Sequence, residues 1–414
     1  MGVISCGTTM LDEGLFQNLP VLSWDTTVKT ANFTAVSGNG YFVNSTAAAR
    51  TVTLPSSPSA GNIVGIKDYA NTGESNSITI ARNGSNINGS AEDVSITNEG
   101  GSITLFYIDA TQGWTVINSG QKNDVEPPTF VAATGGTIST SGDYKIHTFT
   151  GPGTFTVTDA GNAGGSNTVD YMVVGGGAGG GGGQGGGGGG AGGFRESCGC
   201  GYTSSPKGSG VASIPVAVTG YPVSIGGGGA GVPGPSCGNN GGSSAALGIT
   251  SAGGGGGGSG GGNPQNEPGV AGGSGGGGGG RSGNTGGAGN TPSVSPPQGN
   301  TGGSAPPKSS PTIDHGVGGG GATAVGSDGP NCGGGPGGAG ATTNIPGSSL
   351  SKAGGGGGGS ESNNNGSGGP GGGAAGGVDA SANTGGGGGG NAGADEGEGK
   401  SGGSGIVVIR YKFQ

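Results

Sequence analysis

Aromatic and charged residues are scarce in this sequence, at 5% and 9% of its 414 residues. Between residues 175 and 405 the aromatics are limited to Phe194, Tyr202 and Tyr221, so this region lacks the side chains from which a conventional hydrophobic core is built. No stretch of about 18 residues is continuously apolar, and we therefore expect no membrane-spanning segment.

Positive charge is sparse as well. The 14 Lys and Arg residues are outnumbered by 23 Asp and Glu residues, which gives a net charge of −9. Nucleic acids and anionic membrane surfaces attract clustered Lys and Arg, and the sequence has no such cluster. We therefore expect a protein that neither binds nucleic acid nor inserts into membranes.

Combinations of residues that could form a catalytic site are also lacking. The two histidines, His147 and His315, are far apart, and His147 lies in an alternating β pattern that predicts an outward-facing side chain. Residues 394–401, ADEGEGKS, resemble a phosphate-binding loop, but glycines precede them and a strand pattern follows, where that motif requires a strand and then a helix. No nucleophile, base and orienting group can be assembled, so the sequence predicts neither an enzyme nor a cofactor.

The five cysteines are an odd number, and four of them lie in the glycine-rich region. These candidate disulfide cysteines are Cys198, Cys200, Cys237 and Cys332, for which three pairings are possible. Free thiols are the alternative. A zinc site is disfavoured because only Cys198 and Cys200 stand at close spacing, and we expect no bound metal.

Glycine is abundant instead, with 118 residues, of which 96 lie between residues 175 and 405. They come in runs and not at every third position, which excludes collagen. Runs of six occupy residues 185–190, 253–258, 275–280, 354–359 and 385–390. A flexible linker is one interpretation of such a composition.

An ordered alternative follows from the geometry of the glycine backbone. An extended threefold helix rises about 3.1 Å per residue and forms no internal hydrogen bonds, so each peptide group needs a partner on a neighbouring chain. Because glycine has no Cβ, several such helices can pack side by side and bond in every lateral direction. A run of six residues spans about 19 Å. We therefore predict a bundle of short polyglycine II helices joined by loops.

Alternation of apolar and polar residues predicts β-strands on both sides of a polar linker that ends in two prolines. No helical periodicity of useful length appears, so the predicted fold class is all-β: a small β-sandwich-like module, then a β base that carries the glycine bundle. The terminal strand 406–413 needs a partner, and 169–174 is the natural one. The predicted boundaries are an N-terminal segment without a strong pattern at 1–20, the β module at 21–120, the linker at 121–128, the β base at 129–174, the glycine-rich bundle at 175–405 and the closing strand at 406–414.

The segments between the glycine runs are the candidates for binding, because loops on a stiff scaffold commonly carry function. The most informative loops lie within 194–210 and 281–317. The predicted contact residues are Phe194, Arg195, Tyr202, Lys207, Arg281, Asp314 and His315. The alternative is that these loops are ordinary polar connections, with Phe194 and Tyr202 covering the end of the bundle.

Two strand patterns show a family resemblance. The strand Tyr171-Met172-Val173-Val174 runs directly into glycines, and Ser404-Gly405-Ile406-Val407-Val408-Ile409-Arg410-Tyr411 closes the tract. Together they resemble the glycine-rich domains of tailed-bacteriophage tail fibres and related particle proteins. Asn39-Gly40-Tyr41-Phe42-Val43 is similar to a strand of tail-fibre modules. The cysteines and the long segment 281–317 depart from the common pattern, so receptor-contacting residues are not transferred from the family.

The resemblance implies a virion protein, extracellular after release, that attaches a phage to its host. Its expected partners are other tail proteins, through residues 1–20, and a host cell-surface saccharide or outer-surface protein. Whether it is a monomer or a homotrimer is left open. One alternative is a purely structural virion decoration or filament subunit without receptor binding. Another, an ice-binding protein, is disfavoured because a regular Gly-x-x period and a flat Thr- or Ala-rich face are missing.

Overall fold

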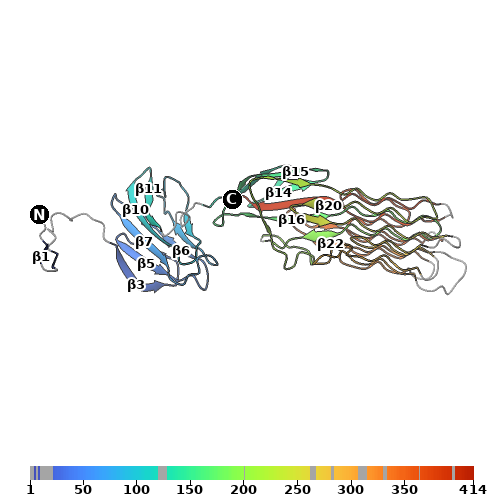
Figure 1. Cartoon of the computed structure of the whole chain (residues 1–414), viewed down its shortest axis with the longest axis horizontal. Helices are drawn as coiled ribbons and strands as arrows, with labels where there is room; N and C mark the ends of the chain where they lie inside the picture. The colour runs from blue at the N-terminus through green and yellow to red at the C-terminus, as the bar shows by residue number, and fades with distance from the viewer. Residues whose placement is uncertain are drawn as a thin grey trace. The chain divides into compact units, whose positions relative to one another are not determined.

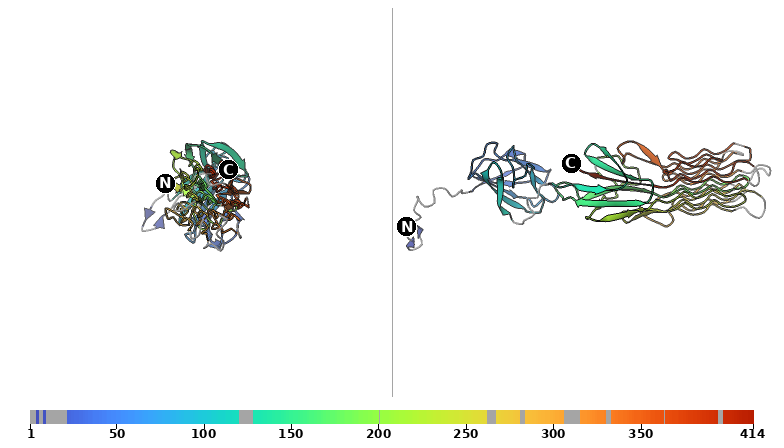
Figure 2. Two further views of the ribbon diagram at one scale, coloured as in Figure 1. Left: turned by 90° about the vertical axis from the view of Figure 1, so that its right-hand side faces the viewer. Right: turned by 90° about the horizontal axis from the view of Figure 1, so that it is seen from above.

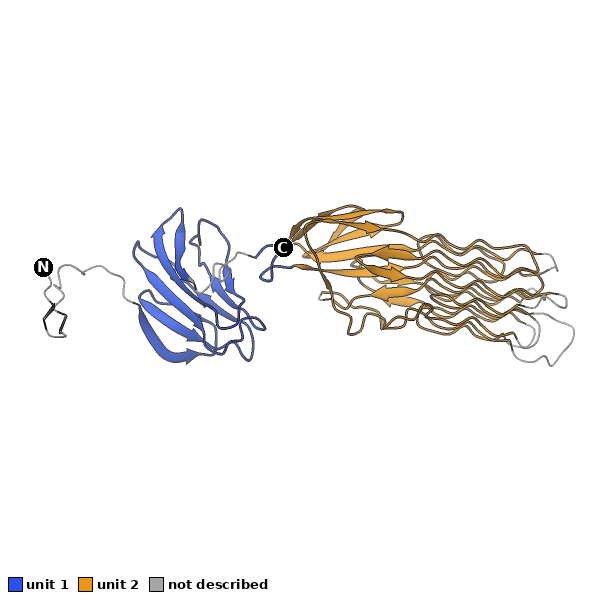
Figure 3. Cartoon of the chain, viewed as in Figure 1, with its two compact units in different colours: residues 1–130, 161–166 blue, residues 131–160, 167–414 orange. Residues whose placement is uncertain are grey.

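The computed structural model describes residues 4–5, 8–9, 22–119, 128–199, 201–261, 267–280, 284–305, 315–329, 333–362, 364–393 and 397–414. The chain divides into two compact units (Figure 3). Unit 1 comprises residues 1–130 and 161–166, and unit 2 comprises residues 131–160 and 167–414. The described residues of both units form strands and turns without any helix, which confirms the all-β prediction.

Unit 1 contains two sheets around one core (Figure 1). Its strands are β3 (Ser23–Lys29), β4 (Phe33–Thr34), β5 (Asn39–Val43), β6 (Arg50–Thr53), β7 (Ile63–Asp68), β8 (Ile78–Ala81), β9 (Val94–Ile96), β10 (Ser102–Asp109) and β11 (Gly113–Ser119). One sheet has the order β11-β10-β7-β5-β3 and the other β4-β6-β8-β9. Strands β3 to β8 alternate between the sheets and pair in parallel with the strand two places along, whereas the last three pair antiparallel. The predicted docking segment 1–20 lies outside the described residues, apart from the short pair β1 (Ile4–Ser5) and β2 (Thr8–Thr9).

The core of unit 1 is filled by alternate residues of the two sheets, as expected for strands with one buried face. Leu54, Ile66 and Trp114 are fully buried in it. Asp68 is also fully buried, and its carboxylate accepts hydrogen bonds from the N–H groups of Gly73, at 2.9 Å, and Gly100, at 3.1 Å. This carboxylate therefore ties two loops to the end of β7.

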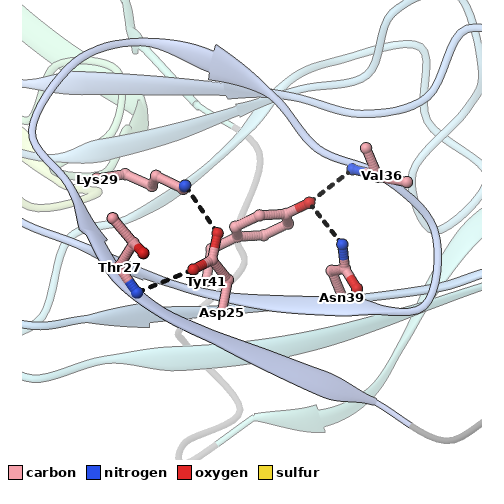
Figure 4. A network of polar contacts seen from close by, with 6 residues as sticks. All are labelled: Asp25, Thr27, Lys29, Val36, Asn39 and Tyr41. Carbon is pink, nitrogen blue, oxygen red and sulfur yellow. Dashed lines mark hydrogen bonds and ion pairs between the residues drawn. The ribbon is translucent and has the colours of Figure 1, made fainter.

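Polar contacts order the first strands of unit 1 (Figure 4). The Lys29 ammonium lies 2.7 Å from the Asp25 carboxylate, which also accepts a hydrogen bond from the Thr27 N–H at 2.8 Å. These contacts hold the pKa of Asp25 below its ordinary value. The Tyr41 hydroxyl accepts a hydrogen bond from the Val36 N–H at 2.9 Å. The cluster shapes the path from β3 to β5, and this local role accounts for it without a ligand.

Unit 2 begins with a group of sheets that we call the base. Its strands are β12 (Val131–Thr134), β13 (Thr137–Ser141), β14 (Tyr144–Phe149), β15 (Gly153–Ala160), β16 (Thr168–Val174), β17 (Phe194–Glu196), β18 (Ile214–Pro215), β19 (Gly220–Val223), β20 (Ser244–Ala246), β21 (Ile249–Ser251), β22 (Ala341–Thr343), β23 (Leu350–Lys352) and β24 (Ile406–Lys412). The main sheet has the order β13-β14-β24-β16-β17. Strand β24 pairs antiparallel with β14 and β16, and Val174 lies opposite Ile406. The predicted pairing of 169–174 with 406–413 is therefore confirmed.

The main sheet is buried on both faces, because one hydrophobic cluster includes Val173 and the other includes Met172. This corrects the expectation that His147 points outward: its side chain is fully buried in β14. The His147 Nδ1 lies 2.7 Å from the Gly135 carbonyl oxygen and the Nε2 lies 3.1 Å from the Tyr411 hydroxyl. Burial lowers the pKa of this imidazole. The alternating pattern predicted that one face of β14 is exposed to solvent, but both faces of this strand are covered by other parts of the base.

Beyond the base, the glycine-rich segments run side by side as extended rods (Figures 1 and 2). The rod at 175–183 shows the bonding pattern. Its N–H groups at 175, 178 and 181 donate to the carbonyls of one neighbouring rod, at residues 193, 190 and 187. Those at 176, 179 and 182 donate to a second rod, at residues 242, 239 and 236. Those at 177, 180 and 183 donate to a third, at residues 403, 400 and 397, and all nine distances are 2.8–3.0 Å. Three bonding directions that repeat every three residues define the threefold helix of polyglycine II.

The same rod also accepts hydrogen bonds from other rods. The N–H groups of residues 254, 257 and 260 donate to its carbonyls at 176, 179 and 182, and residue 388 donates to Ala178. A Cβ added at Gly177 would lie 2.0 Å from the Gly386 carbonyl oxygen, a separation that real structures do not show. The tract is therefore ordered through backbone hydrogen bonds on all sides, and the flexible-linker interpretation is wrong for the described rods.

Candidate functional site

The turns that face away from the base gather at one end of unit 2, which we call the far end (Figure 1). The Gly182 N–H donates to the Ser236 carbonyl and the Gly183 N–H to the Gly397 carbonyl, both at 3.0 Å. The Asn391 side-chain amide donates to the Gly183 carbonyl at 2.9 Å. Rods that are distant in sequence therefore reach their ends at the same level.

Most of the exposed side chains described at the far end are polar, although the prolines Pro235 and Pro268 are also exposed there. Hydroxyl, amide and carboxylate groups predominate, and they include Glu267, Asp328, Glu361, Ser362 and Asn364. These groups offer many hydrogen-bond donors and acceptors and little apolar surface. The rods that support these turns consist mostly of buried glycine. They therefore form a scaffold with few side chains that could move.

One of the predicted contact residues, His315, lies at the far end. It forms a β-bridge with Ser360, and its backbone nitrogen is close to Gly280, since a Cβ added there would lie 3.0 Å from it. Arg281 and Asp314 lie outside the described residues.

The remaining predicted contact residues lie at the opposite end, against the base. Phe194 and Arg195 belong to β17 and pair with Val174 and Val173. Phe194 is only 1% exposed and packs in a hydrophobic cluster of the base, which corrects its prediction as a loop contact. The reason is the reversal of the preceding rod, 185–193, which returns the chain to the sheet.

Hydrogen bonds attach the rest of this segment to the base. The buried Glu196 carboxylate accepts bonds from the N–H and the hydroxyl of Ser205, at 2.8 and 2.5 Å, and from the Thr343 hydroxyl. Burial raises the pKa of Glu196. The Tyr202 hydroxyl donates to the Ser197 carbonyl at 2.6 Å, and its pKa is also raised by burial. These contacts make the segment part of the base.

Lys207 is half-buried and lies two residues after Ser205, which is bonded to Glu196, so it also belongs to the base end. Desolvation lowers the pKa of its ammonium. The predicted contact residues that the structure describes are thus divided between the two ends of unit 2, and they do not form a single surface.

The cysteines are free thiols where the structure describes them. Cys198 is exposed near the base and Cys237 lies on a rod toward the far end. The Cys237 thiol donates to the Glu267 carboxylate at 2.9 Å, and burial with this acidic partner raises the pKa of Cys237 to about 12. The other two disulfide candidates, Cys200 and Cys332, lie outside the described residues.

Two buried charges of the base were missed by the sequence reasoning. Asp170 in β16 and Arg410 in β24 are directly opposite in register and are 6% and 2% exposed. The available signal was a charged residue inside a strand of otherwise apolar residues, since lone buried charges are rare. It could have been noticed in Val407-Val408-Ile409-Arg410.

Two further kinds of feature are absent from the described residues. They contain no group of three or more His, Cys, Asp or Glu side chains placed to hold a metal ion. No helix among them has the length and hydropathy that crossing a bilayer requires.

Comparison with known proteins identifies the glycine tract and its flanking strands. No curated protein matches the chain. A family model described as a glycine-rich domain matches residues 147–412, a range that begins in β14 and ends in β24. Its limits enclose both the rods and most of the strands from which the rods leave and to which they return. The chain belongs to the glycine-rich domain family.

Proposed function

We propose that this protein is an attachment protein of a virus particle, a tail fibre or fibre-tip adhesin of a tailed phage. The arrangement of the rods is the observation that supports this function best. They lead from one folded base to one far end, where turns from separate parts of the sequence are gathered. The resemblance of the two boundary strands to tail-fibre proteins agrees with it.

The physical argument concerns where binding chemistry can reside. A rod interior made of glycine offers neither side chains nor free backbone groups, because its N–H and carbonyl groups are bonded to neighbouring rods. Binding groups are therefore confined to the turns. Because the rods already hold these turns in place, the turns lose little conformational entropy when a ligand binds. The mechanism we propose is binding without catalysis, to a saccharide or an outer-surface protein, with residues 1–20 docking to other tail proteins.

The test is adsorption of the purified full-length protein, labelled fluorescently, to a panel of bacterial cells. A far-end variant combines Glu361→Ala, Ser362→Ala and Asn364→Ala, which are exposed positions in one turn. A control variant combines Thr291→Ala and Ser293→Ala, exposed positions in a turn nearer the base. We expect the far-end variant to lose affinity about tenfold or more and the control to bind as the parent does.

Equal adsorption by both variants and the parent would contradict presentation at this far-end turn. If the protein adsorbs to none of the cells but is detected in purified virus particles, the alternative of a structural virion subunit would be favoured instead.

A further inference from the structure

A polar cavity of about 490 Å³ opens at the base end of unit 2, away from the far-end turns. It is lined by Ser141, Gly201, Tyr202, Thr203, Asn344, Gly347 and Arg410. These residues come from β13, the segment after β17, the turn between β22 and β23, and β24. Its size lies within the range of small-molecule sites, which is roughly 300–1,000 Å³.

Arg410 is the charged residue of this cavity. Its side chain is 2% exposed, and it donates hydrogen bonds to the Ile345 carbonyl at 3.2 Å and the Gly201 carbonyl at 2.7 Å. The guanidinium carbon lies 4.0 Å from the centre of the Tyr144 ring and 5.2 Å from that of Tyr202. Two rings and two carbonyls therefore hold the guanidinium at a fixed position.

No carboxylate of the described residues lies within salt-bridge distance of this guanidinium, and Asp170 attracts it only from further away. A guanidinium carries five N–H donors, and Nε of Arg410 is buried without a hydrogen-bond acceptor. The carboxylate opposite in register, Asp170, is directed to other partners, since its Oδ1 accepts from Ser197 at 2.9 Å and Ser213 at 2.5 Å. A buried cation whose nearest carboxylate is not in contact with it is stabilised by an anion that makes direct contact.

The nearby acids do not oppose an incoming anion as strongly as their number suggests. Burial raises the pKa of Asp170 and of Glu196, which favours their neutral forms. At the rim, Thr203 and Asn344 are exposed and present a hydroxyl and an amide. These are the groups that commonly bond to sugar hydroxyls.

We propose that this cavity binds a small carboxylate that also bears hydroxyl groups, the chemistry of an acidic sugar. Arg410 pairs with the carboxylate, for which its planar fork is suited, and Thr203 and Asn344 bind the hydroxyls. The site is separate from the far-end turns and does not depend on the proposed attachment function.

The test is calorimetric titration of the full-length protein with glucuronate, and with glucose as the neutral sugar of the same ring. We expect glucuronate to bind at least about tenfold more tightly than glucose, because glucose lacks the carboxylate. Asn344→Asp places a carboxylate at the exposed rim and should weaken glucuronate about tenfold by like-charge repulsion. Arg410→Lys, if it folds, should abolish the preference for the acid, because an ammonium lacks the bidentate fork.

The control is the Thr291→Ala, Ser293→Ala variant, whose affinity for glucuronate should equal that of the parent. Two results would overturn the proposal: glucuronate that binds no more tightly than glucose, or equal glucuronate affinity in the parent and the Asn344→Asp variant. The Asn344→Asp variant keeps the test decisive if Arg410→Lys fails to fold, because Asn344 is exposed in a turn and its substitution should not disturb folding.

Discussion

At the residue scale, the rods depend on the absence of a single atom, Cβ. The two glycines Gly227 and Gly229 lie on one rod and illustrate the difference. A Cβ added at Gly229 would lie 2.0 Å from the Asn239 carbonyl oxygen, whereas one added at Gly227 would have no heavy atom within 4 Å. Neighbouring positions of one rod therefore differ in whether they require glycine.

This contrast gives a matched pair of substitutions. Gly229→Ala should destabilise unit 2 by about 1–3 kcal/mol, because the rod must move to admit the methyl group. Gly227→Ala should be neutral or stabilise by up to about 1 kcal/mol, because it only restricts the unfolded chain. Thermal unfolding followed by far-ultraviolet circular dichroism measures both.

The same experiment contains an internal control. Both tryptophans, Trp24 and Trp114, lie in unit 1, so the unfolding transition seen in tryptophan fluorescence should be the same for the parent and both variants. Equal destabilisation by Gly227→Ala and Gly229→Ala would contradict the packing described for this rod.

At the element scale, strands with a readable apolar alternation were predictable, including the short β9, whereas β17 was not. Strands β14, β16 and β24 have apolar alternation or apolar runs long enough to recognise, and a terminal apolar strand needs a partner. Strand β17 has three residues and follows a run of glycine, so its sequence has no periodicity to read. Phe194 was consequently predicted to be a loop contact, although it is buried in the base.

The rods show a different limit of prediction. Their existence followed from composition, because runs of glycine can bond laterally in every direction. Which rods lie next to one another could not be predicted from composition. Shifting a glycine run by three residues replaces each peptide group with an identical one and changes no side-chain contact, so many arrangements are equivalent. Pairing partners are instead determined by the base strands and turns that lead into each rod.

A pH dependence is expected where β17 meets β22. Glu196 is buried and its pKa is raised above the ordinary value of 4.5, so the folded state binds its proton more tightly than the unfolded state does. Its contribution to stability is therefore complete below about pH 4.5 and is lost as the pH rises through the folded-state pKa. Glu196→Gln keeps the size of the side chain and removes this titration.

Denaturant unfolding of the parent and the Glu196→Gln variant across pH 4–8 measures the effect. The free energy of unfolding of the parent, minus that of the variant, should fall as the pH rises above about 4.5. A difference that is constant or increases over this range would contradict the assignment of a raised pKa to Glu196.

At the scale of the whole molecule, the two units achieve order by different means. Unit 1 has a conventional core of Leu, Ile, Val and Trp side chains. Unit 2 has such a core in its base, with the rods held mainly by backbone hydrogen bonds beyond it. One such bond contributes roughly 0.5–1.5 kcal/mol, comparable to the entropy lost per glycine, so the rods are stable as a group and not individually.

Amide hydrogen exchange of the full-length protein, followed by mass spectrometry, tests this order most directly. Peptides from the central rods, such as 176–182 and 254–258, should exchange as slowly as those from β16 and β24, because their N–H groups are bonded and buried. Exchange of the rod peptides at the rate of an unstructured glycine chain, with the strands still protected, would contradict the account.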